Sequence, residues 1–455
     1  MRSRGALALV LHTHMPYVEG FGTWPFGEEW LWEAVASSYL PLVQALPPNP
    51  PLTLSLTPVL CDQLEAPGAI QRCIAFLEQI RQESHARDLA AAKRAGERGQ
   101  VAELERSATE YADAAARLKR LDLPQALGER ATWTSSATHA VLPLLVSDEG
   151  VELQVKIGID SHRRRVGEWS GGFWLPECAH APWLDPLLEE EGVRATCVEL
   201  TNVFGLGDER HLTPLMTDAG TVLWPVDRAT MALVWSVRGY PSSAAYRDYH
   251  RQTEHDHRVH RNDGDVYDQD VAGRQAAEHA SEFVARVKAR VEDGGVCVCA
   301  LDTELLGHWW YEGVVWLERV LEEAERQGLA LTTLDDALEI ANTQPAPPQL
   351  PTTSWGAGGD LRTWSGPAVA EMAWRARAAE LAVLRAERPP SERALRELLA
   401  LQSSDWAFLA TTGTAGDYPR ERAAAHAAAL DRALAGDPEL EPSLRNLAPG
   451  LSRPR

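Results

Sequence analysis

The segment Leu301-Asp302-Thr303-Glu304-Leu305-Leu306-Gly307-His308-Trp309-Trp310-Tyr311-Glu312-Gly313 follows an apolar run, Val296-Cys-Val-Cys-Ala-Leu301. A short apolar run of this kind is typical of a strand that is buried on both faces of a parallel sheet. The chain then presents carboxylates, a histidine and three aromatic rings. Such residues at the carboxyl end of a buried strand are typical of an active site in an α/β protein.

A second segment, Phe173-Trp174-Leu175-Pro176-Glu177-Cys178-Ala179-His180, also sets one carboxylate among aromatic residues. Two carboxylates at separate strand ends are what glycosidic chemistry requires, because one protonates the leaving oxygen and the other attacks the anomeric carbon. Glu177 and Asp302 are therefore the candidate pair. Glu304 lies two residues from Asp302, and we expect it to have a structural or supporting role.

Strand-like and helix-like segments alternate along most of the chain. The expected strands are residues 6–11, 52–58, 193–198, 296–301 and 329–334. The expected helices between them include 184–191, 276–291 and 314–327. This alternation predicts an α/β fold with a parallel sheet, and the chain length favours a closed barrel.

Three segments depart from the alternation and set the domain boundaries. Residues 66–130 are rich in Ala, Glu, Arg and Gln and predict a helical insertion in a catalytic domain of residues 1–345. The Pro-rich segment 343–351 reads as a linker. Helical stretches at 367–387, 391–401 and 419–436 then predict a C-terminal all-helical domain over 352–440. We expect the tail, 441–455, to be frayed.

Composition and charge argue against several classes of partner. A net charge of −21 argues against nucleic acid and anionic membranes as partners. No apolar run approaches the roughly 20 residues of a membrane span, and the short N-terminal apolar run reads as a strand rather than a signal peptide. The six cysteines include no CxxC pair and are expected to be reduced core thiols. We therefore expect a cytoplasmic protein, and composition gives no oligomeric state.

Tryptophan and histidine carry the remaining signals. The chain has 16 Trp against 7 Phe and 9 Tyr, and a flat indole ring suits the apolar face of a sugar. His12 and His14 follow the first strand and share one of its faces. The pair has three readings: a metal site completed by a carboxylate such as Asp302 or Glu177, a site for sugar hydroxyls, or core histidines. His139, in Ala137-Thr-His-Ala-Val-Leu-Pro143, is a further candidate.

Four motifs in this order resemble the signatures of glycoside hydrolase family 57. They are Leu11-His-Thr-His-Met-Pro-Tyr17, Ala137-Thr-His-Ala-Val-Leu-Pro143, Trp174-Leu-Pro-Glu-Cys-Ala-His180 and Asp302-Thr-Glu-Leu-Leu-Gly-His-Trp-Trp310. Ser354-Trp-Gly356 and Leu401-Gln-Ser-Ser-Asp-Trp406 resemble the 1,4-α-glucan branching enzymes of that family. The resemblance covers roughly residues 6–435, and its Trp-Leu-Pro-Glu and Asp-x-Glu-Leu motifs are highly specific.

The resemblance implies a (β/α)7 barrel with a helical insertion and a C-terminal helical domain. It implies retaining chemistry on α-1,4-glucans such as amylose and glycogen, with no metal and no cofactor. Glu177 would be the nucleophile and Asp302 the general acid/base. The residues implied to bind substrate are His12, His14, His139, Trp309, Trp310, Trp355 and Asp405.

Two segments depart from the family pattern. Branching members carry a tyrosine on a mobile loop after the nucleophile motif, whereas residues 204–224 contain no tyrosine. The segment 250–268 has four histidines and many charges where relatives have an aromatic sugar-binding segment, and we expect a solvated loop rather than a metal site. The two departures bear on transfer efficiency, so the near alternatives are an α-glucan hydrolase or 4-α-glucanotransferase on the same scaffold. Two more distant alternatives are a metal-dependent polysaccharide deacetylase built on His12, His14 and a carboxylate, and a non-catalytic glucan-binding protein.

Overall fold

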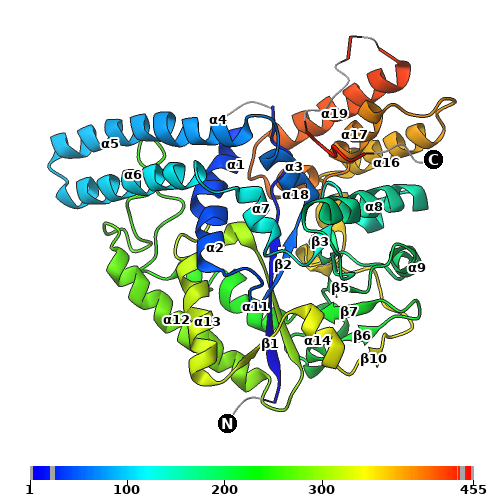
Figure 1. The fold of residues 1–455 in the computed structure, drawn as a ribbon, viewed down its shortest axis with the longest axis horizontal. Helices are drawn as coiled ribbons and strands as arrows, with labels where there is room; N and C mark the ends of the chain where they lie inside the picture. The colour runs from blue at the N-terminus through cyan, green and yellow to red at the C-terminus, as the bar shows by residue number, and fades with distance from the viewer. Residues whose placement is uncertain (1–3, 21–25, 438, 441–445, 452–455) are drawn as a thin grey trace.

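The computed structural model describes residues 4–20, 26–437, 439–440 and 446–451, which form a mixed α/β structure with helices at the C-terminal end (Figure 1). The central strand is β1 (Ala6–Thr13), which lies between β2 (Thr53–Leu56) and β8 (Val296–Asp302), and both pairings are parallel. The register sets His12 opposite Ser55 on one side and opposite Asp302 on the other. The carboxyl ends of the three strands therefore meet at one edge.

Four further strands continue the parallel arrangement: β3 (Thr134–Ser135), β4 (Phe173–Trp174), β5 (Ala195–Val198) and β7 (Val222–Pro225). Ladders join β3 to β4 and β5 to β7. Single parallel bridges link Ser55 to Trp133, Gly172 to Ala195, and Val226 to Val298. Neighbouring strands thus lead from β1 through β2, β3, β4, β5, β7 and β8 back to β1.

Three short strands lie beside this circuit. β6 (Leu215–Met216) runs antiparallel to β7, and β10 (Gln344–Pro345) pairs with β6. β9 (Ala330–Leu331) pairs with the start of β1, so the strand expected over 329–334 is only two residues long.

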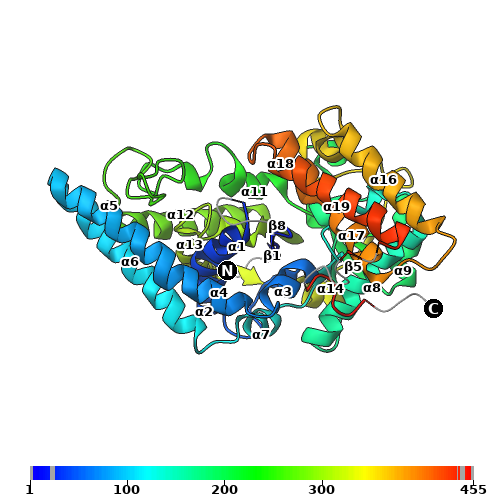
Figure 2. The same cartoon turned by 90° about the horizontal axis from the view of Figure 1, so that it is seen from above.

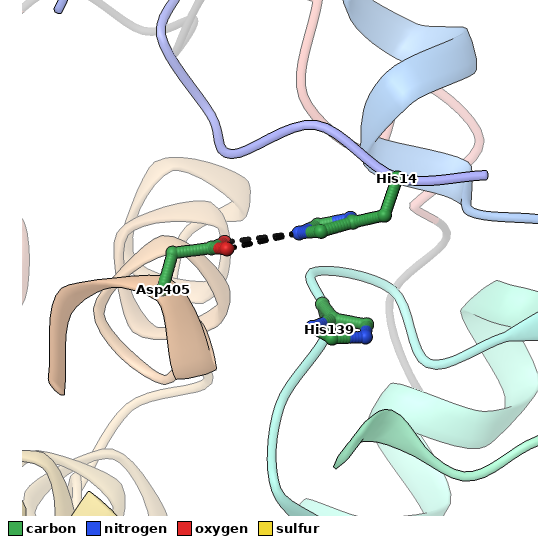
Figure 3. A group of neighbouring side chains, drawn as sticks. All are labelled: His14, His139 and Asp405. Atoms are coloured by element: carbon green, nitrogen blue, oxygen red, sulfur yellow. Dashed lines mark hydrogen bonds and ion pairs between the residues drawn. The ribbon is translucent and has the colours of Figure 1, made fainter. Parts of the chain in front are cut away.

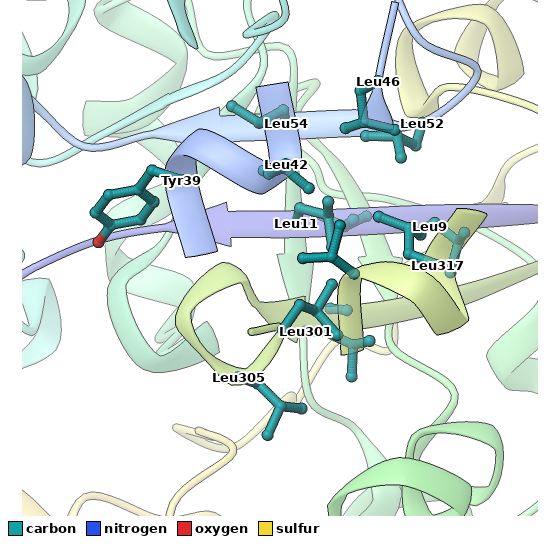
Figure 4. Packing of buried hydrophobic residues seen from close by; sticks show 14 of the residues in the cluster. Leu9, Leu11, Tyr39, Leu42, Leu46, Leu52, Leu54, Leu301, Leu305 and Leu317 are labelled. Atoms are coloured by element: carbon teal, nitrogen blue, oxygen red, sulfur yellow. The ribbon is translucent and has the colours of Figure 1, made fainter. Parts of the chain in front are cut away.

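Helices cover the strands and bury their apolar side chains. Between β2 and β10 the chain forms α3 (Pro58–Leu64), α8 (Asp148–Arg165), α9 (Asp185–Glu190), α10 (Thr201–Phe204), α11 (Arg228–Trp235), α12 (Gln269–Arg290), α13 (Gly313–Gln327) and α14 (Leu334–Ile340). Figure 4 shows how leucines of β1, β2 and β8 pack with Leu42 and Leu317. Because both faces of β1 are covered, its sequence reads as an almost unbroken apolar run.

Residues 28–45 and 66–130 are helical. The first group comprises α1 (Glu28–Ala34), a π-helical turn at Val35–Tyr39, and α2 (Leu40–Ala45). The second comprises α4 (Ala69–Ala75), a π-helical turn at Phe76–Arg81, α5 (Gln82–Ala95), α6 (Arg98–Leu118) and α7 (Leu123–Gly128). α5 and α6 form a long hairpin that projects from the strands (Figure 1).

The segment 250–268 packs against this hairpin. The Nδ1 atom of His255 lies 2.7 Å from a carboxylate oxygen of Asp88, and the buried ring of His257 lies 3.6 Å from that of His85. The expectation of a solvated loop is therefore wrong for His257. It failed because its partners lie more than 150 residues earlier in the chain.

The C-terminal region contains α15 (Arg362–Ser365), α16 (Ala370–Leu384), α17 (Glu392–Leu401), α18 (Ser404–Thr412) and α19 (Tyr418–Ala435). Figure 2 shows this group beside the strands. The sequence did not predict α18, which begins next to the loop of His139. The Ser404 amide donates to the His139 carbonyl at 3.1 Å, and Ser403 bridges to Ala140.

The tail was expected to be frayed over 441–455, of which 441–445 and 452–455 lie outside the described residues. The expectation is wrong for 446–451, because Leu447, Ala448 and Leu451 are buried. The Ala448 amide donates to the Asp62 carboxylate at 2.8 Å. Among the described helices, none is both long and apolar enough to span a bilayer.

Candidate active site

The predicted site residues come from different strands and meet at the carboxyl ends of the strands. His12 and His14 stand at the end of β1, and Asp302 is the last residue of β8. Glu177 follows β4. α18 brings Asp405 to the same place, where one of its carboxylate oxygens lies 3.0 Å from Nε2 of His14.

Glu177 is held by two hydrogen-bond donors from the C-terminal part of the chain. The Trp355 indole N–H donates to Oε2 at 2.8 Å, and the Ser404 hydroxyl donates to Oε1 at 2.9 Å. The backbone of Glu177 has a φ of +64°. This left-handed conformation is strained for residues other than glycine, and such strained residues cluster at functional sites. The Trp355 amide also donates to the Glu177 carbonyl at 3.0 Å, which helps to hold this backbone.

Burial raises the pKa of Glu177 to about 7, while the bonds from Trp355 and Ser404 lower it and the charge of Asp405 raises it. Burial and the charge of Glu177 likewise raise the pKa of Asp302 to about 7, with His14 lowering it and Asp405 raising it further. Within the described part of the chain, no side chain hydrogen-bonds to Asp302. Donors stabilise a carboxylate anion, so the geometry favours the ionised form at Glu177 and the protonated form at Asp302.

Three histidines form a stacked group beside the carboxylates. The Nε2 atoms of His12 and His139 are 2.9 Å apart, and the rings of His14 and His139 stack at 4.0 Å. The His12 ring also stacks on Trp174 at 4.7 Å. Burial lowers the pKa of both His12 and His139 well below the usual value, and neighbouring histidines lower it further. These two rings are therefore neutral at pH 7.

His14, His139 and Asp405 are close enough to hold a metal ion, because one potential ligand atom from each lies within 4.8 Å of the others (Figure 3). Their hydrogen bonds argue for a different use. Nδ1 of His139 bonds Ser404 at 2.8 Å and Nε2 bonds His12, so neither nitrogen has a free lone pair for a metal. Nε2 of His14 already bonds Asp405. The donor set thus fits a hydrogen-bond network better than a metal site.

Glu304 bonds to residues that neighbour the carboxylate pair. Its Oε1 accepts a hydrogen bond from the Tyr39 hydroxyl and another from the His14 amide at 3.2 Å. Burial raises its pKa to about 8, although the bond from Tyr39 lowers it. Glu304 therefore fixes the backbone at His14.

The two neighbouring tryptophans have different environments. Trp309 is 43% exposed and packs on Tyr249 at 4.7 Å, with the Arg258 guanidinium 3.9 Å from the centre of the Tyr249 ring. Trp310 is 2% exposed and packs in the core against Trp316 at 5.3 Å. The two adjacent rings thus differ in exposure, and the role of Trp310 in lining the site stays a prediction.

Sequence reasoning missed two contacts in this site. It did not assign Ser404 any role, and it expected Trp355 to contact glucan rather than Glu177. Both residues stand in motifs singled out above. Their contacts with Glu177 span 178 and 227 residues of sequence, so no local pattern could indicate them.

Comparison with known proteins agrees with this geometry. The sequence model of glycosyl hydrolase family 57 matches residues 128–351, and that of the C-terminal region of 1,4-alpha-glucan branching enzymes matches residues 368–437. The chain is 32% identical to a 1,4-alpha-glucan branching enzyme of Thermococcus kodakarensis, over 93% of this chain and 72% of the relative.

Solved structures give the same result. A branching enzyme of Pyrococcus horikoshii aligns with a TM-score of 0.84 and 31% identity, covering 93% of this chain and 88% of that one. The alpha-amylase AmyC of Thermotoga maritima aligns with a TM-score of 0.78 and 25% identity, covering 98% and 99% of the two chains. The resemblance seen in the sequence motifs is thereby confirmed, and the chain belongs to glycosyl hydrolase family 57.

Proposed function

We propose that this protein is a 1,4-α-glucan branching enzyme that transfers segments of an α-1,4-glucan to a 6-hydroxyl by a retaining mechanism. The relatives named above support the activity. The observation that carries the mechanism is the asymmetry of the carboxylate pair. Glu177 accepts two hydrogen bonds that favour its anion, while within the described residues no side chain donates to Asp302.

In the first step, Asp302 gives its proton to the glycosidic oxygen while Glu177 attacks the anomeric carbon. The bond from the anomeric carbon to the glycosidic oxygen breaks, and an ester bond to Glu177 forms. The released chain leaves with the proton, and Asp302 becomes a carboxylate. The raised pKa of Asp302, caused by burial and by the charge of Glu177, is what a general acid requires.

In the second step, the Asp302 carboxylate takes the proton from the 6-hydroxyl of an acceptor glucan. The acceptor oxygen attacks the anomeric carbon and Glu177 leaves as a carboxylate, so two inversions give net retention. Water in place of the acceptor would give hydrolysis. We propose that His14 and Asp405 bind hydroxyls of the sugar at the cleaved bond. His12 and His139, whose ring nitrogens are hydrogen-bonded within the protein, would stack near His14 and position it. Trp309, Trp355 and the neighbouring Tyr249 would pack on sugar faces.

The scaffold proposed for this activity follows the strand circuit described above. We propose that the circuit is a (β/α)7 barrel within a catalytic domain of residues 1–345, with the helices of 66–130 as an insertion. Residues 352–440 would form a helical domain that completes the site through Ser404 and Asp405. The six cysteines are free and buried, which suits a reducing, cytoplasmic location where a glycogen-like polymer is made.

A glucan hydrolase is the second candidate. Its support is the similarity to the alpha-amylase AmyC and the absence of tyrosine between residues 204 and 224. That segment folds as a short turn of helix at Glu209–Leu212 followed by β6, with Arg210 over the Phe204 ring at 4.4 Å. A 4-α-glucanotransferase would use the same carboxylates and differ only in its acceptor.

One incubation of purified protein with amylose separates these activities. New reducing ends and new chain ends released by a debranching enzyme are measured in parallel. Branches with few reducing ends are expected. Reducing ends without branches would mean a hydrolase. The absence of both products would indicate a deacetylase or a binding protein.

The Glu177→Gln variant should show neither activity while keeping its fold by circular dichroism. Glu380→Gln is the matched control, because Glu380 is a buried glutamate that bonds Ser147 rather than a member of the carboxylate pair. Substantial activity in Glu177→Gln would refute the nucleophile assignment.

A further inference from the structure

A continuous row of hydrogen bonds runs from β2 to the nucleophile. The Ser55 hydroxyl lies 3.3 Å from Nδ1 of His12, and Nε2 of His12 lies 2.9 Å from Nε2 of His139. Nδ1 of His139 lies 2.8 Å from the Ser404 hydroxyl, which donates to Glu177 at 2.9 Å. Each buried imidazole therefore uses both of its nitrogens within the row.

The charge of Glu177 fixes the direction of every proton in this row. An ionised carboxylate only accepts, so the Ser404 proton points at Glu177 and the Ser404 oxygen accepts from His139. A neutral imidazole has one donor and one acceptor nitrogen. His139 thus carries its proton on Nδ1 and accepts at Nε2 from His12. His12 carries its proton on Nε2 and accepts at Nδ1 from Ser55.

The row can also run the other way. Ser55 at its far end is a hydroxyl, which serves as donor or acceptor and so terminates either direction. If Glu177 no longer demands the Ser404 proton, the hydroxyl can turn to Nδ1 of His139. The proton of His139 then resides on Nε2, and that of His12 on Nδ1. Two proton arrangements therefore fit the same heavy-atom positions.

We infer that Ser404 is a positioning residue that couples the charge on Glu177 to the tautomers of His139 and His12. The inference rests on the proposed role of Glu177 as the nucleophile. Glu177 loses its charge when it carries the sugar, so the row is ordered toward Glu177 in the free enzyme and released in the covalent intermediate. When Glu177 regains its charge, Ser404 again donates to it, and this hydrogen bond favours transfer of the sugar to the acceptor.

The surroundings keep the row intact. Ser55 is fully buried, and His12, His139 and Ser404 are each at most 3% exposed. Burial lowers the pKa of His12 and of His139, so both stay neutral and keep one donor each. Among the described residues, the charged or titratable groups that face Glu177 and the histidines include Asp302 on β8, Asp405 on α18, His14 after β1 and the buried thiol of Cys178.

The Glu177→Gln variant should trap the reversed row. The Trp355 indole N–H only donates, so it holds the amide oxygen of the glutamine and leaves the NH2 group facing Ser404. Ser404 must then donate to His139. We expect 15N spectra of selectively labelled protein at pH 8.5, assigned with single histidine substitutions, to show N–H at Nε2 of His12 and Nδ1 of His139. In Glu177→Gln the ring proton should instead reside on Nδ1 of His12 and on Nε2 of His139.

The Ser404→Ala variant should break the coupling and change the pH profile. Its tautomers should not depend on whether residue 177 is Glu or Gln. Loss of a bond to a charged acceptor should move the acid limb of a plot of log kcat/KM against pH, compared at absolute rates, to higher pH by about one unit, and Ser404→Thr should restore it. Ser135→Ala is the matched control, since among the described residues the buried Ser135 hydroxyl bonds the Trp174 carbonyl at 2.8 Å and no other group, so its loss should leave the limb unchanged.

The outcomes are separable. Unchanged histidine tautomers in Glu177→Gln, or an acid limb of Ser404→Ala within about 0.3 units of the parent, would overturn the coupling whatever the activity. Exchanged tautomers together with full activity of Glu177→Gln would instead overturn the proposed nucleophile and leave the hydrogen-bond row standing.

Discussion

The Trp355→Phe substitution tests the electrostatic asymmetry of the carboxylate pair. Phenylalanine keeps an aromatic ring against Trp174, whose centre lies 5.2 Å from that of Trp355. It removes the N–H that donates to Oε2 of Glu177 at 2.8 Å. That bond lowers the pKa of Glu177, so its loss must raise this pKa. The ionised carboxylate, which is the form that attacks, is then populated only at higher pH.

The size of the effect follows from the two pKa values. A hydrogen bond to a charged group contributes roughly 1.5–3 kcal/mol, which is about one to two pKa units at 1.36 kcal/mol per unit. Glu177 and Asp302 both begin near pKa 7. The active form needs Glu177 ionised and Asp302 protonated. Treated as independent titrations, a rise of one unit lowers the peak activity about fourfold and moves it up by about half a pH unit. A rise of two units lowers the peak activity about thirtyfold and moves the peak up by about one pH unit.

The assay is the rate of branch formation on amylose between pH 5 and 9. Trp355→Phe should lower the height of the profile and move its acid limb to higher pH, while KM changes little because the ring remains. A variant that loses activity through KM alone, with the acid limb where it was, would refute the role assigned to the indole N–H. It would leave Trp355 as a glucan-binding residue, the role that its motif indicates.

The remaining predictions concern Asp405, metal ions and the paired tryptophans. Asp405→Asn removes a negative charge that raises the pKa of both Glu177 and Asp302, so the whole pH profile should move to lower pH, and the loss of one sugar contact should raise KM about tenfold. Dialysis against a chelator should leave activity unchanged, and a loss that zinc restores would contradict the network described for His139. Trp310→Ala should lower the free energy of unfolding by about 3–5 kcal/mol in denaturant titrations. Trp309→Ala should cost about 0.5 kcal/mol or less but raise KM for long glucans, and the reverse ranking would mean that the two rings were assigned wrongly.

The strands that carry His12 and Asp302 were predictable because their signal is local. The run before Asp302 is buried over its whole length in β8, and the run before His12 is buried in β1. In a parallel sheet such runs place the next polar residues at one shared edge. His12 and Asp302 are direct partners in the register, so the pattern of two apolar runs, each ending in a polar residue, is enough to bring them together.

The C-terminal contacts were not predictable because nothing near them in sequence requires them. α18 has apolar residues on several sides and no strong amphipathic pattern, so it was not predicted as a helix. Its place is set by packing against the loop of His139. Trp310 shows the same limit, because the pattern that marks aromatic residues at a strand end does not say which of two neighbours faces inward.

The distance along the chain between the nucleophile and its hydroxyl partner has a consequence for protein synthesis. Glu177 leaves the ribosome 227 residues before Ser404. At about 5–20 residues per second this interval is roughly 11–45 s. During that time the nascent chain holds a strand end with its carboxylate but without the serine, and Asp405 is missing as well. The enzyme therefore acquires its chemistry only after residues 404 and 405 have been made, long after the strand that carries its nucleophile.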